Sequence, residues 1–218
     1  MLAVGAVVYA VSGADCDGCV RRAAGGGIAV RLEVLDESGK PLEGATVVVH
    51  SPLGSPVTLT TDDDGAVDAP ELPGPAMAVV TAEGHLPEPV PLGRSDSGKQ
   101  VEVKLFARRG NRFAVHSAGD VMFGRRYATP DEQESSGRSR PLIPTDDAAS
   151  GAQDVVSAIA PAFAAADFRT VNVETVISDK PTGAAYPGKR YILQSAEPTV
   201  AGLRALSADL AVLANNHS

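Results

Sequence analysis

The chain has no tryptophan, and aromatic residues make up only 4% of its 218 residues. Its cores must therefore be built mainly from Val, Leu, Ile and Ala. It also has no excess of basic residues, because 19 Lys and Arg stand against 27 Asp and Glu, giving a formal net charge of -8. Domains that bind nucleic acid usually present a basic face. This balance argues against nucleic acid as a partner.

Cysteine is almost absent as well. Cys16 and Cys19 are the only two, and two thiolates cannot complete a four-ligand zinc site. The thioredoxin-like βαβ pattern that accompanies a redox Cys-x-x-Cys is not visible around them. A small local disulfide, or two uninvolved thiols in a linker, accounts for the pair.

The apolar run that opens the chain, residues 1–10, is too short to span a bilayer. Its length is that of the apolar region of a signal peptide, and Ser12-Gly13-Ala14 would serve as a small-residue cleavage site, although no basic residues precede it. Residues 1–27 are interpreted as a signal-like leader followed by a Gly-rich linker. We therefore expect an exported or envelope-associated, extracytoplasmic protein, with membrane attachment through this segment as an alternative.

Residues 28–107 alternate apolar and polar side chains in short stretches separated by Gly, Pro and Asp turns, which is typical of an antiparallel β-sandwich. The expected strands are 30–34, 45–50, 57–61, 77–82 and 101–105. The turn motifs at 39–45, 61–65 and 82–85 resemble those of carboxypeptidase-regulatory-like (prealbumin-like) domains. The resemblance implies a spacer or binding platform of an exported protein.

One segment of this region allows a second interpretation. Thr60, Asp62, Asp64 and Gly65, with Glu71 at the twelfth position, partly match a calcium-binding loop. However, the first ligand is Thr instead of Asp, and strands flank the segment instead of helices. An Asp-Gly turn explains the same residues.

Residues 112–218 follow a different pattern, in the order β-α-β-α-β. Strands are expected at 113–118, 168–174 and 210–214, with a long loop at 127–150. Helices are expected at 152–166, where Pro161 should kink or split the helix, and after Pro198. This order implies parallel strands with right-handed crossovers, whose carboxyl ends share one edge of a sheet.

Polar residues follow each of these three strands, at the edge where α/β proteins place their chemistry. They are Asp120, Asn172, Glu174, Asn215, Asn216 and His217. Carboxylates, an amide oxygen and an imidazole are ligands of divalent metals such as Mn²⁺, Mg²⁺ or Zn²⁺. Taken singly, Gly-Asp at a strand end is often a turn and Asn-His often a cap. Their recurrence at successive strand ends favours a site.

These motifs also resemble a family. The segments 119–125, 171–175 and 213–218 resemble the CapA proteins, bacterial poly-γ-glutamate capsule synthesis proteins with a calcineurin-like metallophosphoesterase fold. The resemblance implies that Asp120 and Glu174 bind metal, that Asn216 is a metal-ligand amide, and that His217 is a catalytic residue beside the phosphoryl or carboxyl group. It implies two divalent metal ions. The family domain is about twice as long, so residues 112–218 would be its N-terminal part, with an incomplete site.

Other residues are given lesser roles. Asn172, Asn215 and Arg125 are expected to support the site. Lys189 and Arg190 could meet an anionic substrate, although a solvated loop explains them equally. His116, inside a predicted strand, is interpreted as structural.

The predicted fold is thus an α+β multidomain protein, with an N-terminal antiparallel β-sandwich followed by the first half of an α/β metallophosphoesterase-like domain. The leading hypothesis is a CapA-like role in the synthesis or export of an anionic polymer, with hydrolytic activity left open. One alternative is a general metal-dependent phosphoesterase or peptide hydrolase. The other is a non-catalytic surface protein whose sandwich binds polymer.

Overall fold

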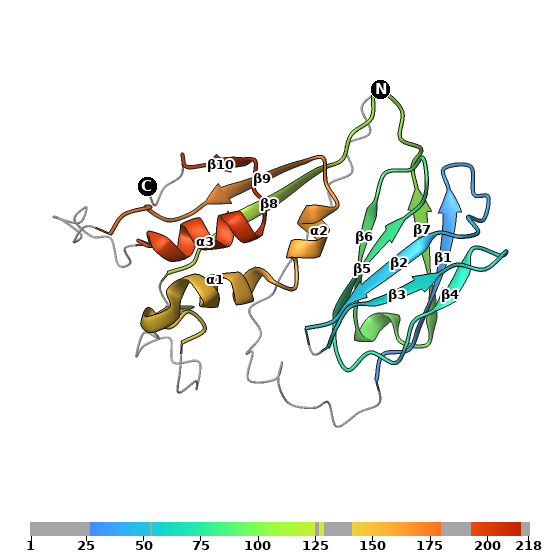
Figure 1. Cartoon of the computed structure of the whole chain (residues 1–218), viewed down its shortest axis with the longest axis horizontal. Coiled ribbons are helices and arrows are strands. Elements are labelled where there is room, and N and C mark those ends of the chain that lie inside the picture. Colours follow the sequence, from blue (N-terminus) through green and yellow to red (C-terminus); the bar gives the residue numbers. More distant parts are fainter. Residues whose placement is uncertain (1–26, 53, 125–126, 129–140, 180–192, 215–218) are drawn as a thin grey trace. The chain divides into compact units, whose positions relative to one another are not determined.

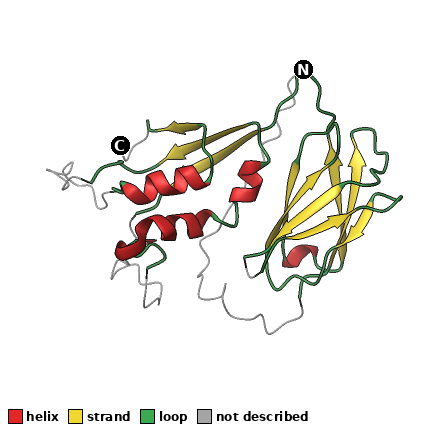
Figure 2. Ribbon diagram, in the orientation of Figure 1, coloured by secondary structure: helices red, strands yellow, loops and turns green. Residues whose placement is uncertain are grey.

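The computed structural model describes residues 27–52, 54–124, 127–128, 141–179 and 193–214. The structure is mixed α/β, with more strand than helix and an N-terminal part rich in strands (Figure 2). It divides into two compact units. The first holds the described residues of Gly18–Ala114 and Ala158–Asp167, and the second holds those of Val115–Ser157 and Phe168–Ser218.

The first unit contains two sheets with the strand orders β4-β1-β7 and β3-β2-β5-β6 (Figure 1). Its described strands are β1 (Val30–Asp36), β2 (Thr46–His50), β3 (Val57–Thr60), β4 (Ala66–Asp68), β5 (Ala76–Thr81), β6 (Glu88–Leu92) and β7 (Lys99–Leu105). A 3₁₀ turn, Arg94–Asp96, precedes β7. The five strands expected from the sequence are confirmed, and β4 and β6 are additional.

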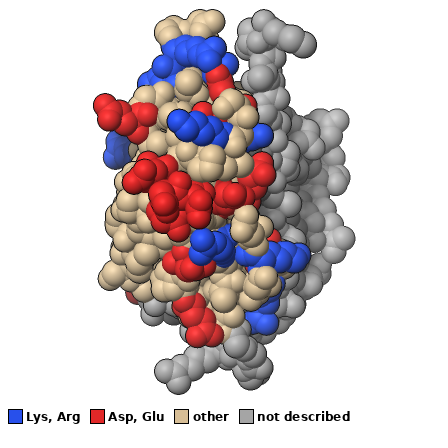
Figure 3. Space-filling model, turned by 90° about the vertical axis from the view of Figure 1, so that its right-hand side faces the viewer, with Lys and Arg blue, Asp and Glu red and all other residues tan. Residues whose placement is uncertain are grey.

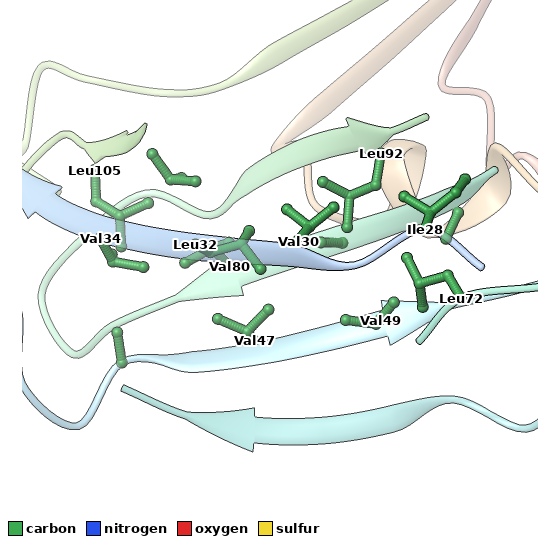
Figure 4. Packing of buried hydrophobic residues seen from close by; sticks show 14 residues of the cluster. Ile28, Val30, Leu32, Val34, Val47, Val49, Leu72, Val80, Leu92 and Leu105 are labelled. Atoms are coloured by element: carbon green, nitrogen blue, oxygen red, sulfur yellow. The ribbon is translucent and has the colours of Figure 1, made fainter. Parts of the chain in front are cut away.

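The two sheets pack face to face around an aliphatic core. Val30, Leu32 and Val34 of β1 face Val47 and Val49 of β2 across the space between the two sheets, and all five are almost fully buried (Figure 4). Alternate residues of each strand point inward because successive side chains of a strand leave opposite faces. Burial of these aliphatic side chains is the main source of stability for this unit.

The prediction of a wholly antiparallel sandwich is wrong for one pair of strands. β1 and β7 are parallel, with Val30 opposite Lys99 and Asp36 opposite Leu105. The other strand pairs of this unit are antiparallel. Alternation of apolar residues determines which face is buried but not the direction of a neighbour. Because β1 and β7 are the first and last strands, the chain between them is long enough to allow a parallel pair.

The segment that partly matches a calcium loop forms a tight turn. Asp62 Oδ1 accepts hydrogen bonds from the backbone N–H groups of Asp64 (3.1 Å) and Ala66 (2.7 Å). Gly65 has a φ of 71°, and a Cβ atom there would come within 2.6 Å of the Val34 carbonyl oxygen. The Asp and Gly residues therefore have a structural explanation as turn residues.

The second unit contains a three-stranded sheet in the order β10-β9-β8. Its described elements are β8 (Val115–Val121), α1 (Ala148–Val156), β9 (Phe168–Val173), α3 (Glu197–Ala205), β10 (Leu210–Val212) and a 3₁₀ turn at Thr145–Asp147. Both strand pairs are parallel, which confirms the prediction. The helices α1 and α3 pack together on one side of this sheet (Figure 1).

The helix expected at 152–166 is split, as Pro161 predicts. It begins earlier than expected, and α1 ends at Val156. A separate short helix, α2 (Ala160–Ala164), has Pro161 in its first turn. Proline lacks the N–H group that an uninterrupted helix would need, but it fits a first helical turn.

Gly202 is expected to be intolerant of a side chain. Phe123, which follows β8, is 1% exposed, and a Cβ on Gly202 of α3 would lie 2.1 Å from its Cζ atom. Gly202→Ala should lower the free energy of unfolding by about 1–3 kcal/mol through overpacking, although alanine alone would favour the helix by about 1 kcal/mol. Urea denaturation followed by circular dichroism measures the change.

A matched double substitution serves as the control for this prediction. Phe123→Leu shortens the side chain that meets residue 202, so Gly202→Ala should cost less in the Phe123→Leu background than in the original chain. Equal costs in both backgrounds would show that the contact with Phe123 does not limit residue 202.

Candidate functional site

Asp120 lies near the carboxyl end of β8, directly after an irregularity in the pairing with β9. Ala118 is opposite Val171, but the next pair along the strands is Asp120 with Asn172. One residue of β8, Gly119, is thus left without a counterpart in β9. Such an extra residue is a β-bulge, which changes the direction of the side chains that follow it.

The bulge places Asp120 beside Asn172 on the neighbouring strand. Asn172 Nδ2 donates a hydrogen bond of 2.5 Å to Asp120 Oδ1. Asp120 is exposed and Asn172 is half-buried. Two polar side chains from sequence-distant motifs therefore meet at a solvent-accessible position.

Glu174 continues the line of β9 on the same side as Asn172. Burial alternates here, because Val171, Val173 and Thr175 are buried whereas Asn172 and Glu174 are only half-buried. The Glu174 N–H group donates to the Val121 carbonyl oxygen at 3.1 Å, which keeps the two strands paired to this point. Since alternate residues of an extended strand share a face, Asn172 and Glu174 both lie on the open face.

The third strand reaches the same edge of the sheet. Val212, the last residue of β10, pairs in parallel with Asn172. The predicted site residues Asn215, Asn216 and His217 follow it, but they lie outside the described residues, as do Arg125, Lys189 and Arg190. His116, interpreted as structural, is half-buried within β8.

The opposite edge of the sheet is occupied by structural contacts. Arg169 and Asp209 are joined by two hydrogen bonds. The Arg169 backbone N–H donates to the side-chain Oδ2 of Asp209 (2.8 Å), and the Asp209 backbone N–H donates to the Arg169 carbonyl oxygen (2.9 Å). The Arg169 guanidinium also pairs with the Asp209 carboxylate at 3.3 Å. These bonds fix the register of β9 and β10 at their amino ends, and hence the position of their carboxyl ends.

The chemistry of the described donor set fits a hard divalent cation. Asp120 and Glu174 offer carboxylate oxygens, which Mg²⁺ and Mn²⁺ prefer. Within the described ranges, no three His, Cys, Asp or Glu residues are grouped as a metal site. The predicted set comprises two carboxylates with Asn216 and His217, and only the carboxylates belong to the part of the chain that the structure describes.

The part of the chain that forms this edge of the sheet matches a known protein family. Residues 114–218 match the family model of the bacterial capsule synthesis protein PGA_cap. The matched PGA_cap region contains β8, β9 and β10 together with the three motifs that end them. It supports a function related to capsule synthesis, and this in turn suggests association with the cell envelope.

Similarity to curated proteins and to solved structures is absent or weak. The chain matches none of the curated proteins. Among solved structures, the Bacillus anthracis TIE protein is 18% identical over 44% of this chain and 18% of its own, with a TM-score of 0.31. The 3-chlorocatechol 1,2-dioxygenase of Rhodococcus opacus 1CP is 12% identical over 39% of this chain and 62% of its own, with a TM-score of 0.32. The chain thus spans less than two thirds of either protein.

Within the part of the chain that the structure describes, no helix combines the length and the apolar character needed to cross a bilayer.

Proposed function

We propose that this chain acts in the synthesis or export of an anionic, capsule-type polymer such as poly-γ-glutamate, at the cell envelope. In this proposal the PGA_cap region has a metallophosphoesterase-type fold, and the sandwich is a prealbumin-like spacer or platform. The observation that supports it is the hydrogen bond between Asp120 and Asn172 at one edge of a parallel sheet, with Glu174 on the same face. This edge lies within the range that matches the capsule synthesis family.

The proposed roles follow from the chemistry of each side chain. Asp120 and Glu174 would hold the divalent metal through carboxylate oxygens, with Asn216 adding an amide oxygen. A bound metal would supply Lewis acidity and lower the pKa of a water molecule. His217, next to Asn216 in the sequence, would donate a proton to the leaving group. Lys189 and Arg190 would attract the anionic substrate.

Acidic side chains on one face of the sandwich count against that face as the site for an anionic polymer. Figure 3 shows Asp and Glu side chains gathered across the middle of one face, with Lys and Arg chiefly above and below them. On the outer side of the β4-β1-β7 sheet, Glu33 of β1 lies opposite Glu102 of β7. Gln100 Nε2 donates to Glu33 at 2.6 Å, and Lys104 is 3.9 Å from Glu102. Like charges at this position repel a polyanion, which favours the PGA_cap region as its binding site.

The experiment that tests this function measures metal and polymer together. The metal-stripped chain is titrated calorimetrically with Mn²⁺ and then incubated with poly-γ-glutamate and with a chromogenic phosphodiester. We expect Mn²⁺ binding and Mn²⁺-dependent binding or shortening of the polymer, both removed by a chelator. Metal-dependent cleavage of the phosphodiester with no effect on the polymer would instead identify a general phosphoesterase. Polymer binding unaffected by the chelator would identify a non-catalytic binding protein.

A further inference from the structure

We propose that the β-bulge at Gly119 turns Asp120 onto the open face of the sheet, and that Asn172 is the positioning residue that holds its carboxylate there. This inference rests on the proposed function insofar as the carboxylate is a metal ligand. The residues concerned are Gly119, Asp120 and Asn172, which are brought together by the pairing of β8 with β9.

The register of β8 and β9 determines the face on which Asp120 lies. Before the bulge, Ser117 is opposite Thr170 and Ala118 is opposite Val171. If pairing continued without interruption, Asp120 would be opposite Val173, whose side chain is fully buried. Because a shift of one residue exchanges the two faces of a strand, Asp120 would then point toward the buried side.

With Gly119 as an extra residue, Asp120 is instead opposite Asn172. Val121 takes the place opposite Val173, so the apolar side chain lies toward the core and the carboxylate lies on the open face. Bulges next to functional sites commonly redirect a side chain in this way. Adjacent residues of a strand always take opposite faces, and the bulge determines that Asp120 takes the open face and Val121 the buried one.

The hydrogen bond from Asn172 fixes the orientation of the Asp120 carboxylate. A carboxylate rotates easily about its terminal torsion, since that torsion has only broad preferences. The 2.5 Å bond from Asn172 Nδ2 to Oδ1 fixes this rotation and therefore the direction of the second oxygen. Hydrogen bonds to the ligands of a metal orient them, and their loss typically lowers metal affinity about 10–100-fold.

Residue 119 does not need to be glycine. A Cβ atom on Gly119 would meet no atom within 4 Å, and Gly119 is not among the glycines with positive φ. Any small residue should therefore form the same bulge. Gly119→Ala should therefore be neutral. The exchange of Asp120 and Val121 (Asp120→Val with Val121→Asp) should instead place the carboxylate opposite Val173, on the buried side.

The test compares variants of the full chain by calorimetric titration with Mn²⁺ and by thermal unfolding without metal. Asn172→Ala should weaken Mn²⁺ binding about 10–100-fold with little change in the unfolding temperature. Thr170→Ala removes a polar side chain two residues earlier on the same strand and should leave the affinity unchanged, as should Gly119→Ala. The exchange Asp120→Val with Val121→Asp moves the carboxylate to the buried side and should abolish binding. Wild-type affinity in Asn172→Ala or in the Asp120–Val121 exchange, or loss of affinity in Gly119→Ala, would overturn the proposal.

The hydrogen bond between Asn172 and Asp120 can also be tested without metal, independently of the proposed function. In the NMR spectrum, the side-chain amide protons of Asn172 should exchange slowly with solvent, and Asp120→Ala should abolish that protection. Protection without any Mn²⁺ binding would uphold the positioning pair and overturn the metal function. Rapid exchange of the Asn172 amide, with or without metal binding, would overturn the positioning role.

Discussion

Replacing Asp120 with alanine is expected to weaken Mn²⁺ binding by more than about 100-fold, the upper end of the loss caused by removing an outer-shell partner. The carboxylate at the end of β8 is exposed, and one of its oxygens is fixed by Asn172. Removing a ligand itself should cost more than removing the residue that orients it. Glu174→Ala should have a similar effect, because Glu174 lies on the same open face at the end of β9.

The control for these substitutions is Asp154→Ala. Asp154 is an exposed residue of α1 in the same unit, and its replacement changes the net charge by the same amount as Asp120→Ala. It should leave Mn²⁺ affinity unchanged when calorimetric titrations of the three variants are compared. If Asp120→Ala and Glu174→Ala bind Mn²⁺ as tightly as the original chain, the metal lies elsewhere and the proposed site is wrong.

The arrangement of the second unit could be predicted because its sequence restricts it strongly. Short apolar runs that alternate with helical connections favour parallel strands, since a parallel pair requires a long crossover. That requirement places the residues after each strand at one edge, and Asp120 and Asn172 do meet there. The split of the long helix could likewise be predicted from Pro161 alone.

The features that the sequence did not reveal depend on pairing between distant segments. The alternation in β1 shows which side chains are buried, but it contains no information about the direction of β7. β4 is only three residues long, and β6 contains Pro89 and Pro91, which are tolerated because β6 is an edge strand. Each of these features is decided by a neighbouring strand.

The bulge at Gly119 is the most consequential feature that sequence reasoning missed. Gly-Asp after an apolar run reads equally well as the start of a turn, and Gly119 lacks the positive φ that would explain a glycine there. Only the pairing of Ala118 with Val171, followed by that of Asp120 with Asn172, shows that one residue is extra. A sequence can therefore predict which residues reach an edge, whereas the face on which each side chain lies depends on the register.

Leu32→Ala is expected to lower the free energy of unfolding of the sandwich by about 3 kcal/mol or more, as large-to-small substitutions in rigid cores do. Leu32 has no exposed surface and lies in β1, between Val67 of β4 and Val101 of β7. Neighbours held on both sides by strand pairing cannot collapse into the space that is left. Val57→Ala, on the edge strand β3 and 40% exposed, is the apolar control and should cost less than about 1 kcal/mol.

Urea unfolding followed by circular dichroism can assign this loss to one unit. A chain with two compact units need not unfold in a single step, so Leu32→Ala and Gly202→Ala should act on different transitions. Leu32→Ala should shift only the transition of the sandwich, and Gly202→Ala only that of the PGA_cap region. If either substitution shifted both transitions equally, the two units would be unfolding as one cooperative body. The loss measured for Leu32 would then belong to the whole chain, because its cavity would be weakening a shared structure.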